Sequence, residues 1–526
     1  MDSRETDHRF RVRETAPSVR AAFLGALLVG LAAQGMALFN KFSWHDDIFS
    51  LFMTGDTITS GRWMLHVLSA LEILLFGDGH FSLPLLNGLF SLLCVGAAAG
   101  LLTDLLQIRN RPLCALLGGL MAAFPMITSL FSFMFAAPYY MLAMLMMVLC
   151  GWLTLGDHSR KAKAAGVLLG GCSVGIYQAF LPLLLSMILL RDIRLLLEED
   201  AGTPAAFLRR VLLQGLCLLG VMAVYLAGSR ICLTLYGLEL SPYMGINQSA
   251  SLPPAAYLAR AAAAWREFFL PTRNVPWDMY PYHIRYLYLA MLGLDAAMAV
   301  RLGVRSLSAG RWKAVPLSLM LLLFPAACNF IFVLSGEVHG LMVYGQTAQA
   351  VLFVFLADRT ARSLPENRLP GPRPGAGRIV SLTAAFLMGL SCVLYVRYDN
   401  ECYLKAAFQQ QQAISWNTEM IARIKSAEGF RQDMPVVMLN RDEASDGTLY
   451  AIGELDSLYL TGYEADIREY INNWAWDSFL QRWCGFGSEI IYETEPYAGW
   501  PEVQAMPSYP ADGSIQVLHG LVVVKF

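Results

Sequence analysis

Trp44-His45-Asp46-Asp47-Ile48-Phe49, followed by Gly61-Arg62-Trp63, is the stretch that decides the fold, because it lies between two long apolar segments, 21–39 and 84–106. Runs of about 20 apolar residues can cross the hydrocarbon core of a bilayer as helices. We therefore expect residues 40–83 to form the first loop of a polytopic helical membrane protein. Such a loop holds two adjacent carboxylates and an arginine at the edge of the bilayer.

The composition also favours a membrane protein. Of the 526 residues, 56% are hydrophobic and 15% are charged, whereas soluble domains carry about 25% charged residues. The net charge of −2 shows no basic excess, so no nucleic-acid partner is expected. The first apolar segment lacks a clear small-residue cleavage site, which indicates a retained span and not a signal peptide.

Apolar segments recur along the chain, and the candidate spans are 21–39, 84–106, 112–133, 138–155, 164–178, 180–197, 211–236, 285–303, 316–335, 342–357 and 379–396. The region 164–197 has two interpretations, one long tilted helix or a hairpin that breaks near Tyr177-Gln178. The hairpin returns Arg191 and Arg194 to the side of the other basic loops. The positive-inside rule then selects about 11 spans, with the N-terminus in the cytoplasm and the C-terminus outside. Half-length helices need protein or water around their turn, so Tyr177 and Gln178 are expected to line a cavity.

Two domains are expected, a membrane domain over 1–396 and an extracytoplasmic α/β domain over 397–526. In the second domain, Pro435–Asn440 and Leu521–Phe526 have the apolar pattern of strands, and Asp466–Trp483 has the pattern of a helix. Cys402 and Cys484 are the cysteines outside the apolar segments. Whether they form a disulfide is left open by the sequence.

The first loop divides into two short helical stretches. In the second stretch, Arg62, His66, Ser69 and Glu72 form one polar stripe on an apolar helix, which favours a helix lying in the plane of the interface. A carboxylate pair beside such a helix can act as a general base towards a hydroxyl. The alternative is that Asp46 and Asp47 only cap a helix N-terminus, where the helix dipole favours acids.

These residues carry a resemblance to a known family. The Asp46-Asp47 pair after the first span, Gly61-Arg62-Trp63 and the later Gly175-Ile176-Tyr177-Gln178 resemble the bacterial O-antigen glucosyltransferases of the Gtr type-two-like family, which are GT-C membrane glycosyltransferases. The resemblance is confined to the membrane region. It implies a multi-pass protein of the bacterial cytoplasmic membrane with a GT-C-like fold.

The resemblance also implies a reaction on the outer face of the membrane. The donor would be a polyprenyl-phosphate hexose, with glucose expected, and the acceptor a hydroxyl of a cell-surface glycan. By analogy, Asp46 or Asp47 would deprotonate the acceptor, and attack at the anomeric carbon would release the polyprenyl phosphate with inversion. The choice between the two acids stays open, since Asp47 could instead position Arg62 or an acceptor hydroxyl.

The phosphate of such a donor needs cationic groups near the outer interface. The donor-binding candidates are Arg62, Arg230, Arg285, Tyr177 and Gln178, and the candidates for the substrate cavity are His45, His66, Glu337, His339 and Tyr344. Arg285 at a span end could equally be snorkelling to the interface, and Glu337 and His339 could belong to an ordinary polar turn. No metal-ligand spacing is evident, so no cofactor is expected, although Asp46, Asp47 and His45 could hold a divalent ion.

Three alternatives remain beside a hexosyltransferase. The closest is a polysaccharide polymerase. A transporter or flippase for a lipid-linked oligosaccharide would place charges along a mid-membrane path and often carries repeats, whereas here the polar residues gather at one edge. The third is a glycan-binding scaffold that stacks sugars on tryptophans of the C-terminal domain, namely Trp474, Trp476, Trp483 and Trp500.

Overall fold

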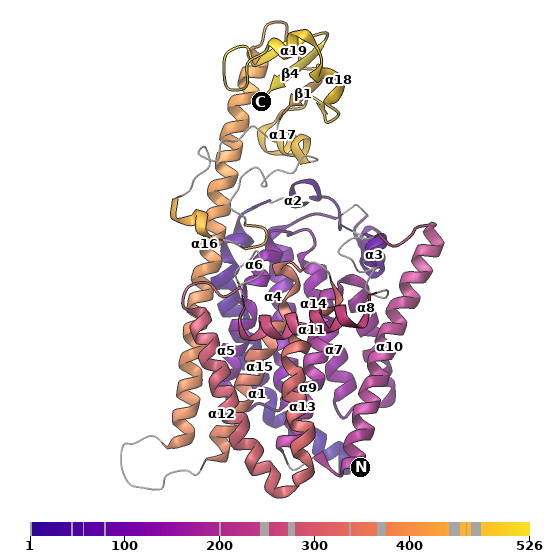
Figure 1. Ribbon diagram of the computed structural model, residues 1–526, viewed down its shortest axis with the longest axis vertical. Coiled ribbons are helices and arrows are strands. Elements are labelled where there is room, and N and C mark those ends of the chain that lie inside the picture. The colour runs from indigo at the N-terminus through magenta and orange to yellow at the C-terminus, as the bar shows by residue number, and fades with distance from the viewer. Residues whose placement is uncertain are drawn as a thin grey trace.

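The computed structural model describes residues 3–43, 46–55, 57–77, 80–198, 201–241, 252–271, 279–335, 338–364, 375–440, 453–458, 460–463 and 475–526. Helices form a body whose members run between a lower and an upper end, and a small lobe stands above the upper end (Figure 1). The helices of the body are α1 (Ser3–Phe39), α4 (Pro84–Leu106), α5 (Arg111–Ala122), α6 (Pro125–Phe131), α7 (Ala137–Leu155), α8 (Arg160–Ile176), α9 (Leu181–Leu197), α10 (Pro204–Tyr236), α12 (Ile284–Ala309), α13 (Ala314–Cys328), α15 (Ala348–Ser363) and α16 (Ala376–Ser426).

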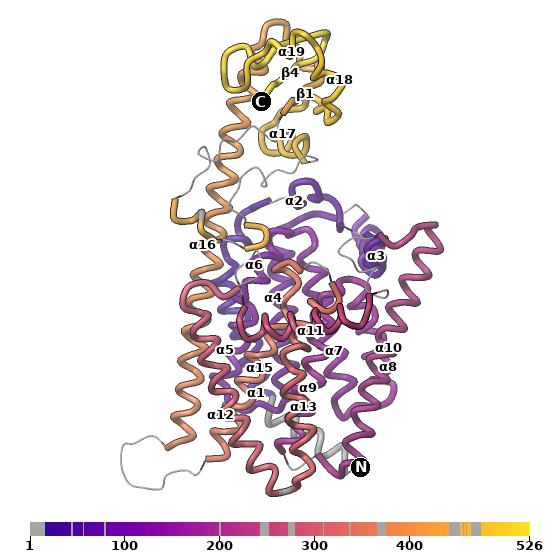
Figure 2. The backbone as a smooth tube through the Cα atoms, in the orientation of Figure 1, coloured from indigo at the N-terminus to yellow at the C-terminus, as the bar shows by residue number. Residues whose placement is uncertain are grey.

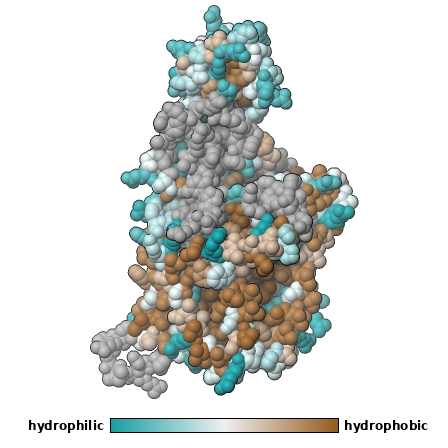
Figure 3. Space-filling model, viewed as in Figure 1, coloured by the Kyte–Doolittle hydropathy of each residue, from teal (hydrophilic) through white to brown (hydrophobic). Residues whose placement is uncertain are grey.

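Within the described residues, eight helical segments are long and apolar enough to cross a membrane. The predicted spans 164–178, 180–197 and 342–357 fold as α8, α9 and α15, which have 17, 17 and 16 residues. These three helices are short for a full crossing, so the count of about 11 spans stays a prediction. On the face shown in Figure 3, apolar side chains cover the helical body and polar ones cover the upper lobe.

Glycines let the first helices of the body pack closely. A Cβ on Gly25 of α1 would lie 2.0 Å from the backbone oxygen of Ala115, and a Cβ on Gly118 of α5 would lie 1.9 Å from that of Ala22. Small residues of this kind allow helix backbones to approach closely in membrane proteins. Close packing matters there because lipid tails are as apolar as leucine, so the hydrophobic effect does not drive helices together. The glycines therefore determine how tightly α1 fits against α5.

The region 164–197 forms the predicted hairpin. α8 ends at Ile176, and Tyr177 has an extended backbone (φ −153°, ψ 113°) that breaks the helix. At the upper end, the Tyr177 ring stacks on Tyr140 near the start of α7. At the lower end, Arg194 in the last turn of α9 donates a hydrogen bond to the Leu105 carbonyl near the end of α4, at 2.7 Å. The chain thus turns back at Tyr177, and the single tilted helix is excluded.

Ion pairs and charged hydrogen bonds join several helix ends at the lower end. Arg359 of α15 pairs with Glu198 at 2.6 Å, and Lys313 Nζ donates to the Glu198 carbonyl at 3.0 Å. Asp358 accepts from the backbone N–H of Asn110 at 3.1 Å. The basic loops therefore lie together, as the positive-inside argument expects.

Short elements cover the upper end: α2 (Asp46–Phe49), η1 (Ile58–Ser60), α3 (Trp63–Phe76), η2 (Gln178–Phe180), α11 (Pro254–Phe269), α14 (Ile331–Leu334), η7 (Gly340–Met342), η8 (Tyr344–Thr347) and η10 (Gly453–Ser457); η6 (Arg311–Lys313) lies between α12 and α13. One side of α3 exposes large apolar residues, with Leu74 79% and Phe76 76% exposed. An apolar face of this size at the end of a helical bundle suits the headgroup layer of a bilayer.

The tube in Figure 2 shows that α16 continues from the helical body into the upper lobe without interruption. This helix has 51 residues. The domain boundary predicted at 396 falls inside it, because residues 390–426 contain neither glycine nor proline to end the helix.

The upper lobe has the predicted α/β character. Its sheet has the order β2-β1-β4-β3, in which β1 is parallel to β2 and β4, and β3 is antiparallel to β4. The strands are β1 (Val436–Leu439), β2 (Ile490–Ile491), β3 (Ile515–Leu518) and β4 (Leu521–Lys525), and the helices are α17 (Trp476–Cys484), α18 (Glu495–Ala498) and α19 (Pro501–Ala505).

The tryptophans and cysteines of this lobe are partly core residues. Trp476 is 8% exposed and belongs to the hydrophobic core, and Trp483 packs against it; Trp474 lies outside the described residues. Cys402 and Cys484 are both free thiols, so the disulfide left open by the sequence is not formed. Burial raises the pKa of the Cys484 thiol to about 11, which keeps it protonated and unreactive at neutral pH.

Candidate active site

Asp47 is fully buried, and hydrogen-bond donors surround its carboxylate. Oδ2 accepts from the Lys41 ammonium and from Ser43 Oγ, the latter at 2.8 Å. Oδ1 accepts from Ser82 Oγ at 2.8 Å and from the Phe135 backbone N–H at 3.0 Å. A carboxylate has about four lone-pair sites, so these donors account for the whole acceptor capacity of Asp47. The residue joins the first loop to the start of α4 and to the turn before α7.

Asp46 has a different environment. It is partly exposed, and it stands at the first position of α2, where its backbone carbonyl accepts from Ser50 N at 2.8 Å. The two acids are adjacent in sequence but have different surroundings. Asp47 is buried in the protein, whereas Asp46 reaches the surface of the first loop. Among the pair, only Asp46 has an exposed side from which a substrate could approach.

The Gly61-Arg62-Trp63 motif packs against the Gly175–Gln178 motif, so the structure joins the two stretches that the sequence singled out. Gln178 Nε2 donates to the Ser60 carbonyl at 2.9 Å. Gly61 has φ 75°, and a Cβ there would lie 2.4 Å from Tyr225 Oη and 3.0 Å from Gln178 Nε2. Only glycine fits this conformation and this space.

Trp63 is held between two helices of the body. A Cβ on Gly175 of α8 would lie 2.6 Å from Cε2 of the indole, and a Cβ on Gly228 of α10 would lie 2.3 Å from the same atom. The two glycines thus form the walls of a slot for the tryptophan ring. Because Trp63 follows Arg62, the slot also fixes the position of the arginine.

The slot gives a prediction about stability. Gly228→Ala should lower the apparent melting temperature, because the added methyl group overlaps the Trp63 ring and overpacking costs about 1–3 kcal/mol. The matched control is Gly215→Ala on the same helix, where a Cβ meets no atom within 4 Å. Thermal unfolding of both variants in detergent checks this, and equal melting temperatures would contradict the slot.

Arg62 lies on a pair of stacked tyrosines. Tyr140 and Tyr177 have ring centroids 4.2 Å apart with an interplanar angle of 4°, and the Arg62 guanidinium lies 5.5 Å from the Tyr177 centroid. Arg62 Nη1 also donates to Tyr140 Oη at 2.9 Å. Tyr177 is 3% exposed, so its ring supports the arginine from within the protein, and its predicted place in a cavity stays a prediction. A guanidinium fixed in this way can present its planar donors to a phosphate.

The segment before and at the start of α7 links the two parts of the site. Phe135 N binds Asp47, and Tyr140 Oη binds Arg62. Between them, Tyr139 donates to Glu72, which also accepts from His80 Nδ1 at 3.1 Å if the ring is protonated there. One short segment therefore fixes Asp47, Arg62 and α3 relative to one another.

The other predicted cations and histidines have contacts and exposures of their own. His66 pairs with Tyr236 Oη of α10 at 2.8 Å, and Arg230 is exposed on α10. Arg285 is half-buried near the start of α12. Their predicted roles in binding the donor or lining the substrate cavity stay predictions.

The remaining candidates for the substrate cavity differ in burial and position. His45 and Glu337 lie outside the described residues. His339 is exposed in the turn before η7, where the following Gly340 N donates to Thr461 Oγ1 at 3.0 Å. Tyr344 is fully buried and donates to the Met121 carbonyl at 2.9 Å, so it is part of the packing between helices.

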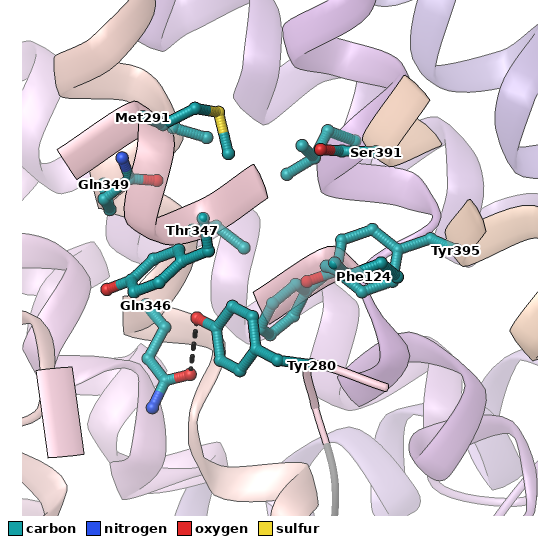
Figure 4. Close-up of a pocket in the computed structure, with 12 residues that line it drawn as sticks. Phe124, Tyr280, Met291, Gln346, Thr347, Gln349, Ser391 and Tyr395 are labelled. Atoms are coloured by element: carbon teal, nitrogen blue, oxygen red, sulfur yellow. Dashed lines mark hydrogen bonds between the residues drawn. The ribbon is translucent and has the colours of Figure 1, made fainter. Parts of the chain in front are cut away.

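A small cavity lies between α5, α12, α15 and α16 (Figure 4). Aromatic side chains such as Tyr280 and Tyr395 line it, and the Tyr280 hydroxyl donates to Gln346 Oε1 at 3.0 Å. The cavity has room for about one water molecule. None of the residues that the sequence singled out lines it, so it is separate from the acids and Arg62.

The sequence did not single out the residues that fix the site. Lys41, Ser82 and Phe135 N hold Asp47, and Tyr140 holds Arg62. Their types are too common to signal a role, and their contacts depend on folding. In the part of the chain that the structure describes, no three or more His, Cys, Asp or Glu side chains come together in a group that could hold a metal.

Comparison with known proteins gives one match. A family model described as "Glucosyl transferase GtrII" matches residues 35–357. The matched range includes Asp46, Asp47, Arg62 and the Gly175–Gln178 motif, and it ends before α16 and the upper lobe. No curated protein and no solved structure matches the chain.

Proposed function

The chain belongs to the glucosyl transferase GtrII family, and from this membership we propose that it transfers a hexose, with glucose expected, from a polyprenyl-phosphate donor to a hydroxyl of a cell-surface glycan. As a multi-pass membrane glycosyltransferase it needs a sugar donor and a glycan acceptor. The upper end of the bundle is proposed to face the outside of the bacterial cytoplasmic membrane, with the N-terminus in the cytoplasm.

The observation that carries the proposal is the attachment of Asp47 and Arg62 to the same short segment, through Phe135 and Tyr140. Because Asp46 is the neighbour of Asp47 in the chain, this attachment ties both the proposed base and a cation to one segment, which suits a reaction between a hydroxyl and a sugar phosphate. The lipid-facing side of α3, which begins directly after Arg62, supports a donor with a long apolar tail.

We assign the base to Asp46 and a positioning role to Asp47. The acceptor capacity of Asp47 is filled by protein donors, whereas Asp46 has an exposed side. In the proposed step, Asp46 takes the proton of the acceptor hydroxyl while the acceptor oxygen attacks the anomeric carbon. The bond between that carbon and the phosphate oxygen breaks with inversion, and the phosphate keeps the electron pair.

Arg62 is the proposed partner of the donor phosphate. Its guanidinium can stabilise the negative charge that the leaving phosphate gains in the transition state. Tyr177 and Gln178 support this role indirectly, since they hold Arg62 and the Ser60 carbonyl. Arg230, Arg285, His66 and His339 remain candidates for more distant contacts with the lipid or the glycan, together with His45, Glu337 and Tyr344.

An assay of the purified protein with a panel of polyprenyl-phosphate sugars tests the function. We expect one hexose to be transferred to glycan acceptors, with inverted configuration at the anomeric carbon. Products extended by many repeat units would indicate a polysaccharide polymerase instead. Movement of a lipid-linked sugar across vesicles without any transfer would indicate a flippase.

The donor set at the acidic pair predicts that transfer needs no divalent metal. A metal between the two acids would have to displace the Lys41 ammonium and the hydroxyl donors from Asp47, and ions such as Mg²⁺ need several oxygen ligands. We therefore expect the rate of transfer to stay the same after dialysis against EDTA. A rate that falls with EDTA and returns with Mg²⁺ or Mn²⁺ would contradict this.

A further inference from the structure

The first loop contacts the C-terminal part of the chain on both sides of the acidic pair. Before the pair, Gln410 Nε2 of α16 donates to the Lys41 carbonyl at 3.0 Å. The ring of Phe42 stacks with that of Tyr403, also on α16, at a centroid distance of 6.3 Å. The ammonium of Lys41 binds Asp47, so α16 holds the backbone of the residue that helps to fix Asp47.

After the pair, the contacts come from α17, which lies above α2 in Figure 1. Arg482 Nη1 donates to the Ile48 carbonyl at 2.9 Å, and the Arg482 guanidinium lies 4.9 Å from the centroid of the Phe52 ring. Carbonyls in the last turn of a helix lack partners within the helix. Arg482 therefore completes the end of the short helix that begins with Asp46.

The side chain of Ile48 strengthens this attachment. It is fully buried, and it belongs to the hydrophobic core of the upper lobe, which also contains Met420 of α16 and Phe479 of α17. Ile48 of the first loop thus completes the core of a lobe that lies far away in the sequence. Burial of this kind sets the position of α2 by the fold of the lobe.

The segment before α17 is in turn fixed to the helical body. Gly462 has φ 88°, and a Cβ there would lie 2.0 Å from Ser132 Oγ. Tyr463 is 2% exposed and donates to the Thr128 carbonyl at 3.3 Å. Both contacts are to α6 and the residue after it, directly before the segment that carries Phe135. The C-terminal region therefore contacts both the helical body and α2.

We propose that the C-terminal region, which lies outside the residues matched by the family model, is part of the catalytic apparatus, and that Arg482 and Gln410 hold the first loop so that Asp46 has one fixed position. This proposal rests on the proposed function for the role of Asp46. Arg482 is a positioning residue, because it acts through Ile48 and Phe52 and does not touch a substrate.

The test compares two arginines with similar contacts. Arg482→Met removes the hydrogen bond to Ile48 and the contact with Phe52. The control Arg423→Met removes a hydrogen bond to the Pro510 carbonyl and a ring contact with Tyr509, both within the upper lobe. We expect kcat to fall about 10- to 100-fold in Arg482→Met with the KM for the donor nearly unchanged, since small misplacements of a reacting group have effects of this size. Arg482→Lys should recover part of kcat, and Arg423→Met should keep it.

Hydrogen exchange gives a readout that does not depend on the reaction. The amides of residues 46–52 should exchange faster in Arg482→Met than in the wild type and in Arg423→Met. Equal kcat and equal exchange in the two methionine variants would overturn the proposal, as would a loss of kcat that Arg423→Met shares. If the wild type transfers no sugar from any donor, the proposed function fails, and the exchange of residues 46–52 alone then decides whether the lobe holds the loop.

Discussion

Asp46→Asn is expected to reduce the rate of sugar transfer by about 10²- to 10⁴-fold, the usual contribution of a general base. An amide cannot take the proton of the acceptor hydroxyl, and no other group fills that role in the proposed step. The side chain is partly exposed at the start of α2, so the change should leave the folded protein as stable as the wild type. Initial rates with the preferred donor and a fixed acceptor measure the effect.

The control for Asp46→Asn is Asp433→Asn, which changes an exposed acid that pairs with Arg431 in the upper lobe. This variant should retain full activity. Wild-type rates in Asp46→Asn would remove Asp46 from the reaction. A loss of activity that is accompanied by a lower melting temperature would indicate a structural role instead.

Asp47→Leu is expected to have its largest effect on stability. The substitution leaves the Lys41 ammonium, two serine hydroxyls and the Phe135 N–H without their acceptor. Removal of one partner from a buried charged pair costs about 3–5 kcal/mol, and we expect the lower end of this range because the Lys41 side chain is 29% exposed and can regain water.

Thermal inactivation in detergent, followed by the fraction of protein that stays monodisperse, measures this effect. The apparent melting temperature of Asp47→Leu should fall by several degrees, and that of Asp46→Leu should change little. An equal fall in the melting temperature of the two variants would contradict the claim that Asp47 is buried and Asp46 is partly exposed. Activity alone does not distinguish the neighbours, since displacement of Asp47 also moves the first loop.

Much of the site could be predicted from residue types and spacing. The break of the hairpin falls at Tyr177, as the sequence indicated, whereas the slot that Gly175 forms for Trp63 is visible only in the structure. The polar stripe on α3 is also real, since Arg62, His66 and Glu72 each bind a tyrosine hydroxyl. The tyrosines themselves could not be predicted, because Tyr139, Tyr140 and Tyr236 lie in apolar helices where an aromatic residue is ordinary.

The sequence by itself determined the helical membrane fold, because a long apolar segment has no stable place except a bilayer or a core, and the bounds of α4 (Pro84–Leu106) agree with the prediction. It also determined that two acids stand at the end of the first span. Only the tertiary structure decided which acid is buried, since the direction of each side chain depends on donors such as Ser82 and Phe135, which come from other parts of the chain. Arg482 and Ile48 are 434 positions apart in the sequence, so their contact likewise exists only after the upper lobe has packed against α16.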